Sequence, residues 1–351
     1  MSFNVKVLKA AHGDCILISG VFDDGIFRNI LIDGGPSKAY EYRQFKGELF
    51  NELSKINKQQ QVIDLLIITH VDDDHIGGLL KGFKNDGLLS LLTKKVWFNS
   101  GKLINEYFNQ QENENLIVLN DSGEVGYTSI RQGVDFEEII ERKGIWDKNI
   151  IMASDIIHIF GIKFTFLSPN EDQLSKLLGK WEKEQPNSLT SSTHTDYDKT
   201  LLELIESDIF EEDNTIHNGS SLAFIFEYKN KRALLLGDAR DSVIVNNLKK
   251  LLKLGESNRF DLIKLSHHGS KYNTSIEFLR IVDCDKYIIS TDGSKHGLPN
   301  KVTLARVYSV KPMASIFFNY PNVIDSKIFK KCELEDLENK KFNILDGTIE
   351  F

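Results

Sequence analysis

The chain has 351 residues, of which 41% are apolar and 27% charged, and its formal net charge is −8. This composition is typical of a soluble globular protein with a sizeable core. The acidic total argues against a protein that relies on a broad basic surface to hold nucleic acid, so a polyanionic substrate would need metal ions or a local basic patch. No stretch approaches 18 consecutive apolar residues, so no transmembrane helix is expected.

The N-terminus and the cysteines favour a cytoplasmic protein. The opening residues, MSFNVKVLKAAHGD, contain neither a long apolar core nor a small-residue cleavage site, so they do not form a secretory signal. Cys15, Cys284 and Cys332 lie far apart and lack paired metal-ligand spacing. We therefore expect reduced, buried thiols in the cytoplasm and no association with a membrane.

The first predicted elements are short apolar strands joined to helices. In chain order they are strands at 3–8, 15–19 and 30–32, a helix at about 42–56, a strand at 62–69 and a helix from about Ile76. The strand at 62–69 is apolar throughout its second half. This pattern predicts a sheet that is covered on both faces.

The middle of the chain, about 99–150, is mixed and polar, and its NQQENEN run is expected to be an exposed loop. A strand region at 156–167 precedes a helix, with Ser168 as its expected N-cap and Pro169 as its first residue. Residues from about 183 to 215 are rich in Ser, Thr and acidic side chains, which predicts a polar excursion. The remaining predicted elements are strands at 221–228, 233–237, 261–265, 285–290 and 315–319 and helices at about 241–254 and 275–282.

A cluster of imidazoles and carboxylates follows the fourth predicted strand. The run LLIITHVDDDHIGGL places His70, Asp72, Asp74 and His75 at positions i, i+2, i+4 and i+5, just before two glycines. Like charges this close cost free energy unless a positive charge lies among them. An exposed acidic turn would explain the aspartates but not two histidines at the end of a buried strand. Imidazole and carboxylate together suit Zn²⁺, Mn²⁺ or Fe.

Four further clusters stand just beyond apolar runs, where loops meet at one rim of a layered α/β sheet. They are Asp33 in LIDGG, His217 and Asn218 in HNGSSLAFIF, Asp238 in ALLLGDAR, and His267 with His268 in DLIKLSHHGS. Taken alone, these would be a turn residue, a surface histidine, a helix N-cap and a structural turn. Together with the first cluster they offer six or seven ligands, too many for one tetrahedral zinc ion. They suit two metals about 3.5–4 Å apart, bridged by a carboxylate and a hydroxide.

These motifs resemble those of the metallo-β-lactamase superfamily, whose second motif, His-x-[His/Asp]-x-Asp-His, is similar to HVDDDH here. Within the superfamily, DHIGG, NGSSL, LLGD and HHGS resemble, in this order, motifs of the hydrolase domain of the competence DNA-uptake channel. Soluble bacterial relatives of that domain also occur beside defence genes. The resemblance covers nearly the whole chain, least specifically at about 100–150 and 183–215. It implies an α/β fold, a four-layer αββα sandwich, as a single domain over 1–351 with a dinuclear site on one edge.

The resemblance also implies roles for individual residues. The implied ligands are His70 and Asp72 on one ion, Asp74 and His75 on the other, and Asp238 as the bridge. His217 matches the third-motif histidine and Asn218 the asparagine of the competence-type proteins; either could reach the metal, and His217 is favoured. One of His267 and His268 should complete the second site. We assign His267 as that ligand and His268 to catalysis or substrate contact, while Asp33 orients the ligand loop.

A dinuclear metal-dependent hydrolase is the expected function. Two divalent transition-metal ions, zinc or manganese, would lower the pKa of bound water towards about 7 and supply hydroxide. His296, or the non-ligand member of the adjacent histidine pair, would protonate the leaving group, and Asp74 would also serve catalysis. The Gly-His-Pro of competence-type proteins is not kept in KHGLP, because Leu298 stands before Pro299 and His296 lies two residues earlier.

Phosphodiester cleavage is the reaction that the resemblance favours, with nucleic acid among the candidate substrates. A small phosphoester or a lactone is the alternative substrate. A different class of alternative is a non-catalytic component of bacterial defence that binds metal or a partner, or an effector that a protein partner switches on. A degenerate, non-catalytic member would lose one or more of His70, Asp74, His75 and Asp238, and this chain keeps all four.

Overall fold

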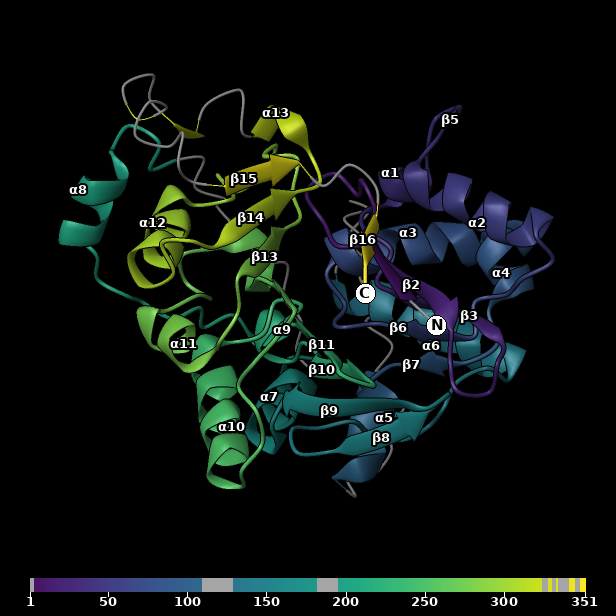
Figure 1. The fold of residues 1–351 in the computed structure, drawn as a ribbon. Coiled ribbons are helices and arrows are strands. Elements are labelled where there is room, and N and C mark those ends of the chain that lie inside the picture. Colours follow the sequence, from purple (N-terminus) through teal and green to yellow (C-terminus); the bar gives the residue numbers. More distant parts are fainter. Residues whose placement is uncertain are drawn as a thin grey trace.

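The computed structural model describes residues 3–108, 129–181 and 195–323, with 328–329, 333, 341–344 and 348–351 near the C-terminus. The N-terminal part (purple to blue) and the C-terminal part (green to yellow) lie side by side in Figure 1. The expected NQQENEN loop and residues 183–194 of the expected excursion lie outside the described residues. Among the described residues, no helix combines the length and the apolar character that a membrane span needs.

The first sheet has six strands in the order β16-β1-β2-β3-β6-β7. They are β1 (Phe3–Val7), β2 (Ile16–Val21), β3 (Phe27–Ile32), β6 (Leu65–Ile67), β7 (Val96–Trp97) and β16 (Thr348–Glu350). β1, β2 and β3 pair antiparallel, whereas β6 and β7 continue the sheet parallel to β3. All three residues of β6 are buried, which confirms that this part of the sheet is covered on both faces.

The second sheet has eight strands, in the order β15-β14-β13-β12-β11-β10-β9-β8. They are β8 (Ile156–Ile159), β9 (Ile162–Ser168), β10 (Ala223–Tyr228), β11 (Lys231–Leu235), β12 (Leu262–Lys264), β13 (Lys286–Ile289), β14 (Ser315–Phe318) and β15 (Lys341–Ile344). β8 to β11 pair antiparallel, and β11 to β15 run parallel. Parallel strands end at the same edge, so their following loops lie close together.

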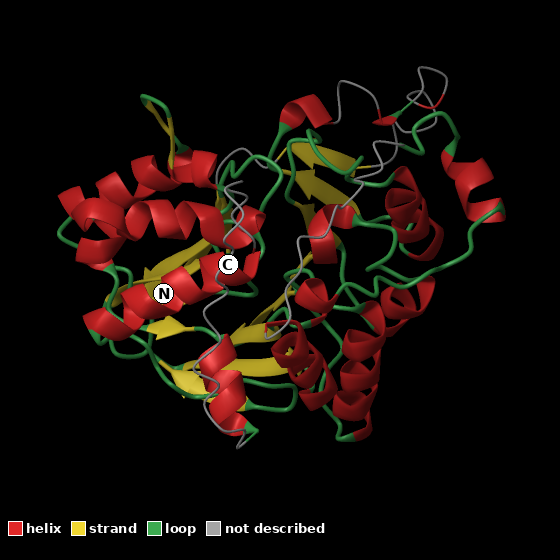
Figure 2. Cartoon of the chain, turned by 180° about the vertical axis from the view of Figure 1, so that it is seen from behind, coloured by secondary structure: helices red, strands yellow, loops and turns green. Residues whose placement is uncertain are grey.

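Aromatic side chains fill the space between the two sheets. Phe3 of β1 packs on Phe226 of β10, and Trp97 of β7 packs on Phe164 of β9, with ring centroids 5.2 and 5.1 Å apart. Helices cover the outer faces, as Figure 2 shows from behind. These helices include α2 (Glu48–Lys58), α3 (Asp73–Phe83), α6 (Ser129–Lys143) and α7 (Glu171–Trp181) over the first sheet and α10 (Asp241–Lys253), α11 (Ile276–Ile281) and α12 (Lys301–Val310) over the second. The expected αββα sandwich is therefore confirmed.

Shorter elements connect these layers. They are α1 (Ser37–Tyr40), the hairpin β4 (Glu41–Tyr42) and β5 (Phe45–Lys46), η1 (Lys84–Asp86), α4 (Leu88–Leu92), α5 (Gly101–Tyr107), α8 (Leu201–Glu206), α9 (Ile216–Gly219), η2 (Ser266–Gly269) and α13 (Pro321–Val323). The helix expected from residue 42 begins only at Glu48, because the hairpin occupies the preceding residues. Arg43, at the hairpin turn, has a left-handed φ of 55°.

Two predictions about the start of α7 are wrong. Ser168 is not its N-cap, because Ser168 is the last residue of β9, and Pro169 is not its first residue, because α7 begins at Glu171. Asn170 is the cap: its Oδ1 accepts from the Gln173 amide and the Gln173 side chain accepts from the Asn170 amide, both at 2.9 Å. Within the polar excursion, α8 forms because Thr200 and Glu203 make a capping box.

Candidate metal centre

The predicted ligands follow strands that are neighbours in each sheet. β3 and β6 of the first sheet lead to Asp33 and to the second motif, and β11 and β12 of the second sheet lead to Asp238 and to η2. β3 pairs with β6 and β11 pairs with β12, both in parallel. Short loops after these four strands therefore bring side chains from both sheets to one place.

The second motif spans the end of β6 and the first turn of α3. Asp72 is the N-cap residue of α3, and Asp73, Asp74 and His75 form its first turn. The positive end of the helix dipole favours carboxylates at this position. Asp73 turns away from the site and accepts a hydrogen bond from Gln132 of α6 at 2.8 Å. Two of the three consecutive aspartates therefore remain available to the site.

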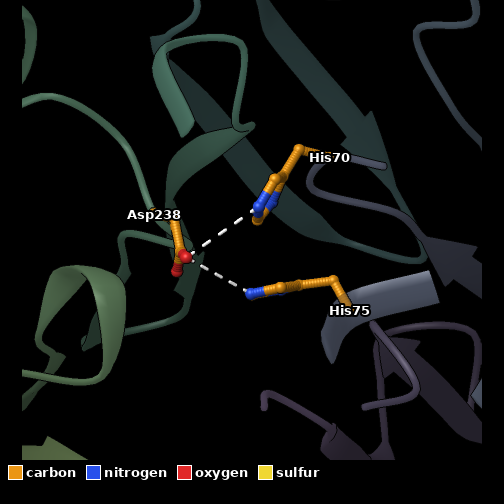
Figure 3. A group of neighbouring side chains, drawn as sticks. All are labelled: His70, His75 and Asp238. Atoms are coloured by element: carbon orange, nitrogen blue, oxygen red, sulfur yellow. Dashed lines mark ion pairs between the residues drawn. The ribbon is translucent and has the colours of Figure 1, made fainter. Parts of the chain in front are cut away.

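Four histidines surround Asp238. Its Oδ2 lies 3.4 Å from His75 Nε2 and 3.8 Å from His70 Nε2 (Figure 3), and 3.8 and 3.9 Å from the Nε2 atoms of His268 and His267. These distances exceed the roughly 3.2 Å upper limit of ordinary N–H···O hydrogen bonds. Two ligand atoms that each lie about 2.1 Å from a tetrahedral metal are about 3.4 Å apart. The separations therefore suit ligands of a shared cation.

The atoms that surround this space lack hydrogen-bond partners. Within the described part of the chain, the Nε2 atoms of His70, His75, His217 and His268 and Oδ1 of Asp238 are buried without one. Leaving such an atom unsatisfied costs about 1–3 kcal/mol, and native proteins contain few of them. Buried imidazole and carboxylate donors with free lone pairs fit divalent transition-metal ions.

Three sets of ligand atoms share His75. His70, His75 and Asp238 have ligand atoms within 4.8 Å of one another, and so do Asp74, His75 and His268, and Asp14, Asp33 and His75. The described residues thus offer several overlapping groups of metal ligands around one imidazole.

The two adjacent histidines point in different directions. Both have left-handed backbones, with φ of 47° for His267 and 53° for His268, and their rings are inclined by 72°. His268 Nε2 lies 3.4 Å from Asp74 Oδ2, and its Nδ1 lies 2.9 Å from the Ser290 carbonyl oxygen, which it can contact as a donor. His267 Nδ1 instead lies 3.4 Å from Asp213 Oδ2. This geometry favours His268, rather than His267, as the ligand beside Asp74.

Asn218 and His267 belong to a polar network beside the centre. The Asn218 amide donates to Asp213 at 2.6 Å, and the Asn273 amide donates to the same carboxylate at 3.2 Å. His267 Nδ1 lies 3.1 Å from Asn273 Oδ1. The side-chain amide of Asn218 is thus engaged with Asp213 instead of with the ligand cluster.

His217 and Asp72 pair with each other beside His70. His217 Nδ1 lies 2.7 Å from Asp72 Oδ1, and Asp72 Oδ2 lies 3.7 Å from His70 Nε2. Neither residue belongs to the sets of ligand atoms within 4.8 Å of one another that the described residues form. Nε2 of His217 nevertheless remains buried and unpartnered.

Asp33 fixes the orientation of His75. Its carboxylate accepts hydrogen bonds from the Thr69 amide at 2.8 Å and the Thr69 hydroxyl at 2.7 Å, and it lies 2.8 Å from His75 Nδ1. With Nδ1 engaged in this way, Nε2 of His75 faces Asp238. Such partners hold a metal-binding imidazole in one tautomer and orientation.

Sequence reasoning missed three buried polar residues at this centre. Lys264 contacts Asp14 Oδ2 through its ammonium, and Asp14 Oδ1 lies 3.3 Å from His268 Nδ1. His12 is only 6% exposed, its Nδ1 has no partner among the described residues, and burial lowers its pKa to about 4. A lysine inside the apolar run DLIKL was a usable signal, because lysines are rarely buried without a partner.

His296 lies at the exposed edge of the centre. Partial burial lowers the pKa of His296, while the charge of Asp74 acts in the opposite direction. The loop that carries His296 is fixed to the N-terminal part of the chain, since the Asp292 amide donates to the Ala11 carbonyl at 2.8 Å and Lys38 Nζ lies 3.8 Å from Asp292. His296 is thus an exposed side chain close enough to Asp74, a candidate ligand, to feel its charge.

The carboxylates and imidazoles of the centre shift one another's pKa values. Burial opposes ionisation of Asp238, but the imidazoles, first that of His75, hold the pKa of Asp238 well below its usual value. Burial likewise opposes protonation of His75, but Asp238 and Asp33 raise its pKa well above the usual value. Against the same effect of burial, Asp14 and Asp238 raise the pKa of His268 to about 9. Bound cations would replace these protons as counter-charges, so metal binding should release protons.

Comparisons with known proteins give a partial match. None of the curated proteins compared with the chain matches it significantly. Similar solved structures include the metallo-beta-lactamase fold protein YhfI from Bacillus subtilis (10% identity, 100% of this chain and 99% of that one, TM-score 0.43). A second is Zn²⁺-bound PqqB from Methylobacterium extorquens, with 10% identity over 99% of this chain and 99% of that chain and a TM-score of 0.43. A third is an isothiocyanate hydrolase from Delia radicum gut bacteria, with 14% identity over 99% of this chain and 98% of that chain and a TM-score of 0.42. Similarity at this level transfers no activity.

The sequence match covers the part of the chain that holds the second motif. The sequence model of the family described as "Metallo-beta-lactamase superfamily" matches residues 15–91. This segment runs from β2 to α4 and includes Asp33, His70 and His75. Over residues 15–91 the chain is therefore similar to the metallo-beta-lactamase superfamily.

Proposed function

We propose that this protein is a dinuclear metal-dependent hydrolase of phosphodiester bonds, with zinc or manganese as its ions. The observation that carries the proposal is the set of buried, unpartnered ring nitrogens around Asp238. Their separations from the carboxylate suit shared metal ligands better than hydrogen bonds. The superfamily match over residues 15–91 supports the hydrolase class.

Each ion has its own ligand set in this proposal. His70 and Asp72, with His217 beside them, would hold the first ion, and Asp74, His75 and His268 would hold the second. Asp238, whose Oδ2 lies between 3.4 and 3.8 Å from the Nε2 atoms of His70, His75 and His268, would be shared by both ions. When bound, the ions would activate water for attack and offset the negative charge of the phosphoryl group. His268 replaces the expected His267 as ligand because its Nε2 is the atom that lies near Asp74.

Several residues hold the ligands in place. Asp33 engages Nδ1 of His75, and the Ser290 carbonyl engages Nδ1 of His268, so both Nε2 atoms are directed to the ions. Burial of both rings, His75 at 0% and His268 at 1% exposure, restricts them further. In this proposal the two ligands are positioned before any ion binds.

Two histidines remain to contact the substrate. His267 is held by Asp213, its side chain is 26% exposed, and its Nε2 lies 3.9 Å from Asp238. His296 lies at the exposed edge of the centre. Either one would protonate the leaving oxygen of the substrate, a step that is worth about 10²–10⁴-fold in rate.

The preference for a phosphodiester rests on the resemblance of DHIGG, NGSSL, LLGD and HHGS to the competence-type motifs. The charges beside the centre are mixed. Apart from burial, Lys295 and Lys38 lower the pKa of His12 while Asp74 and Asp292 raise it, and Lys38 Nζ lies 3.8 Å from Asp292. These charges do not by themselves select an anionic substrate.

The proposal can be tested by metal analysis and a substrate screen. Purified protein is loaded with Mn²⁺ or Zn²⁺, analysed for metal and assayed with bis-p-nitrophenyl phosphate, single- and double-stranded DNA, RNA and a lactone. Asp74→Asn should lose metal and activity, whereas Asp73→Asn is the matched control, since its side chain faces Gln132. Loaded protein that holds no metal, or that hydrolyses no phosphodiester, would contradict the proposal.

A further inference from the structure

Asp14 and Lys264 form a buried ion pair behind the metal centre. Asp14 is 2% exposed and Lys264 1%, and the ammonium contacts Asp14 Oδ2 and lies 3.3 Å from the Gly237 carbonyl oxygen. Removing two charges from water often costs more than their attraction returns. The pair therefore calls for a reason other than stability alone.

The pair connects loops that carry metal ligands. The Asp14 amide donates to the Asp74 carbonyl at 3.2 Å, and the Asp14 carbonyl accepts from the Gly35 amide at 2.7 Å. A Cβ on Gly13 would lie 1.9 Å from the backbone carbonyl oxygen of Asp74, so only glycine allows the two loops to approach this closely. Lys264 adds the loop of Asp238 through the carbonyl of Gly237. Asp14 is thus fixed in place by its backbone as well as by its side chain.

The second oxygen of Asp14 faces a metal-binding histidine without a hydrogen bond. Asp14 Oδ1 lies 3.3 Å from His268 Nδ1 and has no hydrogen-bond partner among the described residues. His268 Nδ1 is already engaged by the Ser290 carbonyl at 2.9 Å. The orientation of the ring therefore comes from Ser290, and the main contribution of Asp14 at this position is its negative charge.

We propose that Asp14 is the charge-balancing residue of the second ion site. Its carboxylate neutralises Lys264, so that a divalent cation between Asp74, His75 and His268 does not face an unpaired buried ammonium. Lys264 in turn ties Asp14 to the loop of the bridging carboxylate. This inference rests on the proposed metal centre and adds a residue pair from outside its ligand set.

A double-mutant cycle separates charge balance from simple packing. The affinity of both ions is measured by chelator competition in wild type, Asp14→Asn, Lys264→Met and the double variant, together with the Tm of each metal-free protein. Asp14→Asn should weaken one of the two ions by about ten- to hundredfold, the usual effect of residues behind a ligand. Lys264→Met should not weaken it, and the double variant should return to within about threefold of wild type, a non-additive result.

The buried ion pair of Lys301 and Glu333 provides a matched control. Lys301 Nζ lies 2.6 Å from Glu333 Oε2, and neither residue is on a loop that carries a proposed ligand. Lys301→Met should lower Tm and leave both metal affinities unchanged. Wild-type affinity in Asp14→Asn, or a double variant as weak as Asp14→Asn, would overturn the charge-balance proposal alone. Wild-type protein that binds no ion would contradict the proposed function and this inference with it. Should Asp14→Asn fail to fold, Lys264→Met decides, because a hundredfold loss there refutes charge balance and retained affinity supports it.

Discussion

Asp241, at the first turn of α10, is predicted to make the stability of the protein depend on pH. It is 5% exposed and accepts a hydrogen bond from the Ser275 amide at 2.8 Å. Burial raises the pKa of Asp241 from its ordinary value of 3.8 to about 6, although the hydrogen bonds from Ser275 act in the opposite direction. The native state therefore binds this proton more tightly than the unfolded chain does.

The sign and size of the effect follow from that difference. Below pH 4 both states are protonated and Asp241 has no effect. Between pH 4 and 6 the unfolded chain ionises first, so the free energy of unfolding falls as pH rises. Above pH 6 the full penalty applies, about 3 kcal/mol for a shift of roughly two units. Asparagine keeps the acceptor oxygen without the charge, at a loss of about 0.3–1 kcal/mol from the helix dipole.

Asp241→Asn should therefore raise stability at pH 8 and change it little at pH 4.5. The assay is urea unfolding of the metal-free protein at both pH values, with midpoints and slopes compared between variant and wild type. At pH 8 we expect the free energy of unfolding to rise by about 2 kcal/mol, which is the cost of burying the charge minus the lost interaction with the helix dipole. An equal gain at both pH values, or a loss at pH 8, would refute the reasoning that burial of the charge is costly here.

Further predictions concern the centre and the domain. We expect about two transition-metal ions per chain by elemental analysis, and Asp238→Asn should lower the occupancy of both. Unchanged occupancy with near-normal turnover would show that Asp238 is not a metal ligand; nor is it the cap of α10, because the N-cap residue of that helix is Arg240. His268→Ala should lose metal and turnover together, whereas His267→Ala and His296→Ala should keep the metals. The variant that lacks the proton donor should turn over about 10²–10⁴-fold more slowly, and a substrate with a p-nitrophenolate leaving group should restore its rate. Loss of metal from either variant would show that the replaced histidine is a ligand. Limited proteolysis should cut within 183–215 without releasing two folded fragments, because both sheets share one core, and two stable fragments would contradict a single domain.

The general position of the site could be predicted because it depends on local sequence patterns. Apolar runs mark strands, and a polar residue directly after such a run lies at the end of a strand. Asp33 directly follows β3, and His70, Asp238 and His268 come three to four residues after the ends of β6, β11 and β12. Parallel neighbours then bring these ends to one edge without further information from the chain.

The assignment within the adjacent histidine pair could not be predicted, because the two residues are chemically identical and consecutive. Two left-handed backbone conformations in succession decide which ring faces Asp74, and nothing in HHGS states that both residues adopt them. Lys264 and Asp14 were missed for a related reason. Their contact joins residues 250 positions apart, so neither sequence neighbourhood contains the partner.

The helix α12 was missed because buried charges interrupt its apolar pattern. Lys301 and Arg306 are buried, which hides the apolar face that a helix prediction requires. Arg306 donates to Asp208 at 2.6 and 2.8 Å, and Lys301 contacts Glu333. These partners come from distant parts of the chain, so the pattern becomes intelligible only once the fold has formed.

The geometry of the centre implies that the metal-free fold carries a local cost. Five buried atoms without partners at about 1–3 kcal/mol each represent a large share of a typical stability of about 5–15 kcal/mol. The rest of the sandwich must offset this cost, which explains why the unpartnered atoms lie beside a core that both sheets share. Because His70 and His75 come from one sheet and Asp238 and His268 from the other, ions at the centre would bind both at once. Metal binding would therefore stabilise the packing of the two sheets by RT ln(1 + [metal]/Kd) for each site that only the folded protein forms.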